Sequence, residues 1–208
     1  MMQLYDYYRS SCSYRVRIAL NIKQLDYSVV PINLVNDGGE QFSEAYTAIN
    51  PQQLVPSLDT EDGIINQSLA ILEYLDERYT KPSLLPKNSY KRAQVRSLMY
   101  LIACEIHPLN NLRVLKTLKL EYSISDDEKL AWYHNWLRVG FDALENKLNQ
   151  FPREVPVCFE DNITMADLCL VPQVYNAKRF EFNLDDYPLI NSINEYCLNI
   201  QAFSKSAP

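Results

Sequence analysis

The chain lacks the features that mark three large classes of protein. No apolar run approaches the roughly 18 residues of a membrane-spanning helix, and residues 1–20 lack the basic-then-apolar pattern of a secretory signal. Acidic residues outnumber basic ones, 26 to 20, which gives no general attraction to nucleic acid or to an anionic membrane. We therefore expect partners other than nucleic acid and membrane.

Paired cysteines are missing as well. The five cysteines include no C-x-x-C pair and no Cys/His spacing typical of a metal site, so we predict no bound metal. An odd number of scattered cysteines is typical of reduced thiols in a cytoplasm. Cys104, Cys169 and Cys197 have apolar neighbours, and we interpret them as small core residues.

The first third of the chain alternates strand and helix patterns. We expect strands at 4–8 and 27–32 and helices at 12–23 and 42–48, then a hairpin of 54–59 with 64–66 and a helix from Ser68. The order β-α-β-α-β-β-α favours a small α/β sheet domain.

Two prolines, Pro82 and Pro86, mark the predicted domain boundary, which gives domains 1–82 and 87–208. The second domain has only helical patterns: one from Tyr90 that Pro108 should break, one from about 126, and one over 189–200. Thr164 followed by Asp167 resembles a capping box at the start of another helix. We expect an all-helical domain.

The stretch Ser10-Ser11-Cys12-Ser13 places three hydroxyls and a thiol where the first helix begins. A helix N-terminus carries unpaired backbone N–H groups and a partial positive charge. These residues indicate a site for an anion or a thiolate, or alternatively only a serine-capped helix.

Two more features of this domain leave a similar choice open. Val55-Pro56 precedes a strand, where a cis proline would leave backbone groups free for a peptide-like ligand; an ordinary strand-opening proline is the alternative. Gln67-Ser68 begins the third helix, where Ser68 is either a cap alone or also a ligand for a carboxylate.

Taken together, these residues resemble the glutathione site of the cytosolic glutathione transferases, in which a thioredoxin-like domain precedes a helical domain. The stretch from Ser10 to Leu20 is similar to the zeta class, whose bacterial and animal members are maleylacetoacetate isomerases. The resemblance covers nearly the whole chain. Supporting stretches are 37–42, 50–52, 67–71 and 166–173, and residues 164–167 resemble the helix-capping motif of the superfamily.

The resemblance implies a role for each site residue. Ser10 would hydrogen-bond the glutathione thiolate, and Ser11 and Cys12 would line the thiol site. Arg9, Arg15 and Arg179 would bind the carboxylates of a small dicarboxylate substrate. The remaining implied glutathione-binding residues are Arg15, Gln41, Val55 (through its backbone), Gln67, Ser68, His107 and Asn111. The family also implies a homodimer.

The implied reaction is the cis–trans isomerisation of maleylacetoacetate to fumarylacetoacetate, in tyrosine and phenylalanine catabolism. A free thiol, with a pKa of about 8.5, is mostly protonated at neutral pH. A helix N-terminus and a hydroxyl donor lower that pKa. The thiolate attacks the cis double bond, which becomes a carbon–carbon single bond about which the adduct can rotate. Loss of the thiolate then gives the trans isomer and regenerates glutathione.

Other functions stay open. Tyr14 and His107 stand where the family usually has Trp and Gln, which leaves the substrate open among maleylacetoacetate, maleylpyruvate and α-haloacids. A broad-scope transferase that conjugates or dehalogenates α-haloacids would consume glutathione. A glutaredoxin-like thiol transferase would use Cys12 as its nucleophile. A non-catalytic adaptor on the same fold would have a degraded thiol site.

Overall fold

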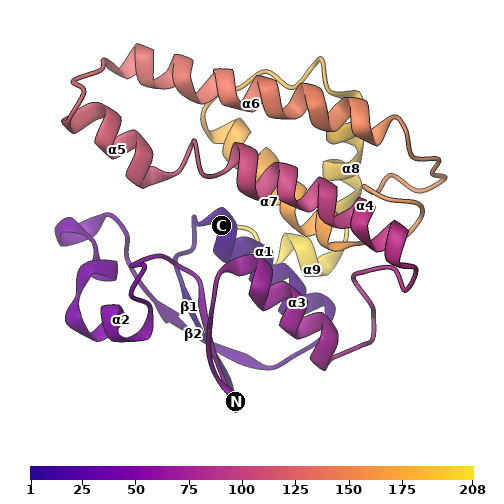
Figure 1. Cartoon of the computed structure of the whole chain (residues 1–208), viewed down its shortest axis with the longest axis horizontal. Helices are drawn as coiled ribbons and strands as arrows, with labels where there is room; N and C mark the ends of the chain where they lie inside the picture. The colour runs from indigo at the N-terminus through magenta and orange to yellow at the C-terminus, as the bar shows by residue number, and fades with distance from the viewer. The chain divides into compact units, whose positions relative to one another are not determined.

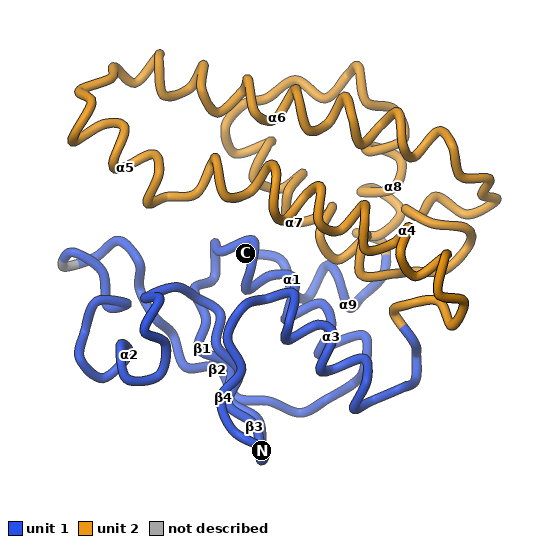
Figure 2. The backbone as a smooth tube through the Cα atoms, in the orientation of Figure 1, with its two compact units in different colours: residues 1–83, 200–208 blue, residues 84–199 orange. Residues whose placement is uncertain are grey.

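The structure, a computed structural model, describes residues 1–36 and 38–208; Asp37, in the predicted loop 36–39, lies outside the described residues. Two compact units are present, residues 1–83 with 200–208 and residues 84–199 (Figure 2). Within the described ranges, no helix is both long and apolar enough to cross a membrane.

The first unit contains a four-stranded sheet in the order β2-β1-β3-β4. β1 (Met2–Asp6) pairs in parallel with β2 (Tyr27–Pro31) and antiparallel with β3 (Ser57–Thr60), which forms a hairpin with β4 (Gly63–Asn66). A parallel pair needs a crossover connection, and α1 (Ser11–Ile22) supplies it. The predicted α/β domain is confirmed.

Successive side chains of β1 point to opposite faces of the sheet, and each face is covered by different helices. Tyr5 packs its ring 5.9 Å from that of Tyr46 in α2 (Glu44–Ile49). Leu4, fully buried, points to the opposite face. Figure 1 shows α1 and α3 (Ser68–Arg78) on one side of the sheet and α2 on the other. Two short 3-10 helices, η1 (Asn36–Gly38) and η2 (Glu40–Phe42), precede α2.

The second unit is helical, as predicted. Its helices are α4 (Ser89–Tyr100), the π-helix η3 (Leu101–Ile106), α5 (Leu112–Leu120), α6 (Asp126–Leu148), α7 (Met165–Arg179) and α8 (Pro188–Leu198). The helical run from Ser89 ends just before Pro108, as expected. The sequence pattern did not predict α5, because Leu115 is the only residue in it that is buried.

The predicted capping box at the start of α7 is confirmed. The backbone N–H and the hydroxyl of Thr164 donate to Oδ2 of Asp167 at 2.7 and 3.0 Å, and the N–H of Cys158 donates to Oδ1 at 2.7 Å. Burial raises the pKa of Asp167, and these donors oppose the rise. Asp167 therefore joins the helix to the preceding loop.

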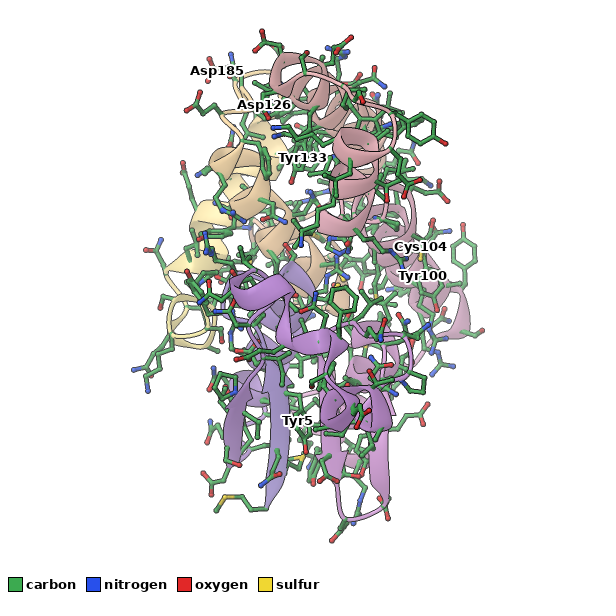
Figure 3. All side chains as sticks on the ribbon, turned by 90° about the vertical axis from the view of Figure 1, so that its left-hand side faces the viewer. Tyr5, Tyr100, Cys104, Asp126, Tyr133 and Asp185 are labelled. Atoms are coloured by element: carbon green, nitrogen blue, oxygen red, sulfur yellow. The ribbon has the colours of Figure 1, made fainter. Side chains whose placement is uncertain are left out.

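One of the three cysteine predictions is wrong. Cys169 and Cys197 are buried, but Cys104 is exposed, at the surface near Tyr100 (Figure 3). Cys104 lies between Ile102 and Ile106, which are both fully buried, and so occupies the outward face of the π-helix. Its apolar neighbours in sequence lie on a different side of the helix.

Residues 200–208, which include α9 (Gln201–Ser204), pack in the first unit. The sequence-based division had placed them with the helical residues 87–208. Phe203 and Ser206 are both buried there, and α9 packs on α1.

Candidate functional site

Strand pairing brings three chain segments to one edge of the sheet. Ser57, the first residue of β3, pairs with Tyr5 and with Asn66. The end of β1, the beginning of β3 and the end of β4 therefore lie together. The loop that leads to Ser10 leaves this edge, Val55 enters it, and Gln67 follows it.

Ser10 is the N-cap of α1 and accepts a hydrogen bond on Oγ from the N–H of Ser13, at 3.3 Å. Because Oγ is the acceptor, the hydroxyl hydrogen remains available to donate to another group. Ser11 is buried and Cys12 is partly exposed in the first turn, which contains no acidic residue. The positive end of the helix is therefore not neutralised locally, an arrangement that favours a bound anion or thiolate.

Arg15 lies one turn further along α1 and is only 1% exposed. Its Nη1 donates to Oγ of Ser68 at 3.3 Å and to Sγ of Cys12 at 3.8 Å. Among the described residues, its Nε and Nη2 are buried without a hydrogen-bond partner. The guanidinium thus adds positive charge beside the thiol site. Its burial disfavours the predicted direct contact with a substrate carboxylate.

The Val55–Pro56 peptide bond is cis, the first of the two possibilities that the sequence left open. Val55 is buried in a cluster with Tyr7, Ile32 and Tyr46. Its backbone N–H and carbonyl make no hydrogen bond to any residue that the structure describes. They are therefore available to a peptide-like ligand.

Ser68 is not the cap of α3. The N-cap is Gln67, with a left-handed φ of 72°, and its side chain makes no capping bond. Ser68 is instead the first helical residue, and its Oγ accepts from Arg15, which leaves the hydroxyl hydrogen free to donate. Sequence reasoning missed Gln52, whose Oε1 accepts from Nε2 of Gln67 at 2.6 Å; its place in the family-like stretch 50–52 was the available signal.

Gln41 and Arg9 complete the predicted site residues of the first unit. Gln41 lies in η2, and within the described ranges its buried Oε1 has no hydrogen-bond partner. Arg9 places its guanidinium carbon 5.0 Å from the ring centre of Tyr8.

Three predicted site residues belong to the second unit. Nδ2 of Asn111 lies 3.4 Å from Nε2 of His107, and Asn111 also caps α5. Arg179, at the end of α7, is exposed and donates to Oδ1 of Asn176 at 3.1 Å. An exposed guanidinium remains able to bind a carboxylate.

Comparison with known proteins identifies the family. The model of the glutathione S-transferase N-terminal domain matches residues 4–83. Maleylacetoacetate isomerase of Rattus norvegicus is 47% identical over 205 residues, which are 99% of this chain and 91% of the rat protein. The chain belongs to the maleylacetoacetate isomerase family, the zeta class of glutathione transferases. The predicted architecture, a thioredoxin-like domain with a helical domain, is confirmed with it.

Solved structures of the zeta class agree. Maleyl pyruvate isomerase, a bacterial enzyme solved in its holo form, has a TM-score of 0.96 at 41% identity, covering 99% of this chain and 96% of its own. Maleylacetoacetate isomerase from Anaeromyxobacter dehalogenans, solved with dicarboxyethyl glutathione and citrate, has a TM-score of 0.88 at 35% identity, covering 100% and 94%.

Proposed function

We propose that the protein is a glutathione-dependent isomerase that converts maleylacetoacetate to fumarylacetoacetate. The observation that carries the proposal is the first turn of α1, where the Ser10 hydroxyl hydrogen and an unneutralised helix N-terminus meet beside Arg15. The similarity to maleylacetoacetate isomerases over the whole chain supports the same reaction.

The residues at the sheet edge fit glutathione. The free backbone groups of Val55 match a peptide backbone. The start of α3 is suited to a carboxylate. Oγ of Ser68 accepts from Arg15, so its hydroxyl hydrogen is available to donate to that carboxylate. Gln41 and Gln67 offer amide groups to the rest of the peptide.

When bound, glutathione supplies a thiol whose ionised form adds reversibly to the cis double bond and is released again with the trans product. Ser10 donates its hydroxyl hydrogen to the sulfur and so favours the ionised form. The helix N-terminus acts in the same direction. The family resemblance assigns Arg9 and Arg179, each within its own unit, to substrate carboxylates, and Arg15 acts through Cys12 and Ser68 from its buried position. Dicarboxyethyl glutathione, bound by the Anaeromyxobacter enzyme, is the product expected when a thiolate adds to a four-carbon unsaturated dicarboxylate.

The test is an assay of the purified protein with maleylacetoacetate, maleylpyruvate and an α-haloacid while free glutathione is monitored. We expect isomerisation of maleylacetoacetate with no net loss of glutathione. Stoichiometric consumption of glutathione, with the α-haloacid as the better substrate, would establish the conjugating transferase instead.

A second candidate function is favoured by one contact, the 3.8 Å approach of Arg15 Nη1 to Cys12 Sγ. A cation beside a partly exposed thiol favours its thiolate, as a glutaredoxin-like thiol transferase requires. That function predicts a mixed disulfide between Cys12 and glutathione that mass spectrometry would detect during turnover.

We further propose a homodimer in the cytoplasm. The apolar content of α3 and α4 is not itself evidence for a dimer, because apolar residues of these helices such as Leu72 and Met99 are buried within the units. Support comes from the family and from the exposed Tyr90 and Tyr100 of α4 and Ile64 of β4. Light scattering at micromolar concentration should give twice the mass of the chain, and cell fractionation tests the compartment; a monomeric mass would contradict the dimer.

A further inference from the structure

Arg17 of α1 joins three segments of the first unit by hydrogen bonds. It is 8% exposed. Nη1 donates to Oδ1 of Asp6 at 2.6 Å, Nη2 to the carbonyl of Tyr8 at 2.8 Å, and Nε to the carbonyl of Ser206 at 2.9 Å. The guanidinium thus holds the end of β1, the following loop and the segment 200–208.

The loop that Arg17 holds is the one that ends at the thiol site. The N–H of Ser10 donates to the carbonyl of Tyr7 at 2.8 Å, so residues 7–10 form a turn. Arg17 donates a hydrogen bond to the carbonyl of Tyr8 inside that turn. The position of the Ser10 hydroxyl therefore depends on the orientation of a guanidinium that binds the chain two residues before it.

Tyr14 connects the same helix to the same segment. Its side chain is 1% exposed, and its hydroxyl donates to the carbonyl of Phe203 at 3.1 Å. Asn21 adds a third bond, from Nδ2 to Oγ of Ser206 at 2.7 Å. Three residues spread over α1 therefore fix the segment along the helix. Tyr14, which stands where the family usually has Trp, has a buried bond to the backbone here.

We infer that the segment 203–206 is a positioning element for the thiol site, acting through Tyr14 and Arg17. The inference rests on the proposed function, because it supposes that Ser10 acts on a bound thiol. The Ser206 carbonyl fixes one side of the Arg17 guanidinium and so keeps the other side aligned on Asp6 and Tyr8. The Phe203 carbonyl fixes α1 one turn after Ser10. Placement of a reacting group depends on shifts well below an ångström.

The first experiment compares two deletions in the full-length protein. Deletion of residues 206–208 removes the carbonyl that Arg17 binds, while deletion of Pro208 alone leaves it in place. A third variant, Ser206→Ala, keeps the carbonyl and removes the two side-chain hydrogen bonds of Ser206, to Asn21 and to the carbonyl of Ala202. The readouts are kcat/KM and the pKa of the bound glutathione thiol, followed by the ultraviolet absorbance of its thiolate.

We expect the 206–208 deletion to lower kcat/KM by about tenfold or more, the loss equivalent to one hydrogen bond to a charged group. The pKa of the bound thiol should rise toward that of free glutathione. The Pro208 deletion should match the wild type, and Ser206→Ala should leave the thiol pKa unchanged. A lower melting temperature with an unshifted thiol pKa would overturn the inference, because it would show a stabilising role only.

A second set of variants keeps the inference testable if the deletion does not fold. Tyr14→Phe removes only the hydroxyl that binds the Phe203 carbonyl, and it should raise the thiol pKa in the same direction. Tyr14→Trp retains an N–H donor and should restore the wild-type value. A Tyr14→Phe protein with an unchanged thiol pKa would contradict the inference. A wild-type protein without any bound thiolate would instead refute the proposed function.

Discussion

Arg15, in the second turn of α1, donates a hydrogen bond from Nη1 to Oγ of Ser68, the first residue of α3, at 3.3 Å. The two residues are 53 positions apart in the chain and are both buried. This hydrogen bond holds together the two helix N-termini to which we assign the thiol and the carboxylate of glutathione. The buried arginine therefore supports the site through its hydrogen bond to Ser68.

Replacement of Arg15 by methionine should weaken glutathione binding more than it weakens the fold. The change removes a charge-assisted hydrogen bond that contributes roughly 1.5–3 kcal/mol, so the glutathione Kd should rise at least about tenfold. A buried, incompletely paired charge is itself costly, so the melting temperature should fall little. Titration calorimetry and thermal melting measure the two effects; an unchanged Kd would show that Arg15 does not support the site.

Replacement of Asp167 by alanine should destabilise the second unit. Three buried donors on Thr164 and Cys158 lose their acceptor, and loss of a cap together with unsatisfied buried donors costs about 2 kcal/mol or more. Asp126→Ala, at the exposed first turn of α6, is the matched control and should have a much smaller effect. Glutathione affinity of the folded Asp167→Ala protein should remain near wild type. Equal melting temperatures for the two variants would contradict this account of the capping box.

Replacement of Gly140 by alanine should be destabilising, although alanine is ordinarily the better helix former by about 1 kcal/mol. A Cβ at position 140 would overlap Cγ1 of Ile106, which is fully buried in the π-helix. Overpacking of this kind costs roughly 1–3 kcal/mol. Chemical denaturation measures it, and the double variant Gly140→Ala/Ile106→Ala should be less destabilised than the sum of the single changes. If the changes in the free energy of unfolding were additive, the two side chains would not be in steric conflict.

Most of the first unit could be predicted from the sequence, because its signals are local. Strand and helix periodicity placed β1, α1, β2 and α3 within a few residues, and the hydroxyl-rich stretch at Ser10 marked a helix start that the structure confirms. The cap residue of α3 could not be predicted correctly. Serine is a residue type that favours the cap position, but the Ser68 hydroxyl accepts from Arg15. That tertiary contact cannot be read from the local sequence.

The remaining differences have the same origin. The placement of residues 200–208 depends on the bonds that Tyr14, Arg17 and Asn21 make to them, across more than 180 positions of sequence. From the sequence, Tyr14 is a departure from the family that bears on substrate preference. In the structure its hydroxyl makes a buried hydrogen bond to the carbonyl of Phe203. The exposure of Cys104 depends on the face of a π-helix, which apolar composition alone does not indicate.

Replacement of Arg179 by alanine should raise the substrate KM more than it changes glutathione affinity. The residue is exposed and donates to Oδ1 of Asn176, and an exposed guanidinium is able to bind a substrate carboxylate. Loss of such a contact is worth about tenfold or more in KM. Arg113→Ala, an exposed residue of α5, is the control and should leave KM unchanged. Equal losses of substrate and glutathione affinity in Arg179→Ala would mean that the residue has a structural role.

The most direct test of the central claim, that the nucleophile is the glutathione thiolate and that Ser10 supports it, is kcat/KM of Ser10→Ala measured beside that of Cys12→Ala. Loss of the Ser10 donor removes roughly 1.5–3 kcal/mol of stabilisation from the thiolate, so its activity should fall by about ten- to a hundredfold. Cys12→Ala should retain substantial isomerase activity, because Cys12 forms no covalent bond in this reaction. An inactive Cys12→Ala beside an active Ser10→Ala would contradict the account and establish Cys12 as the nucleophile.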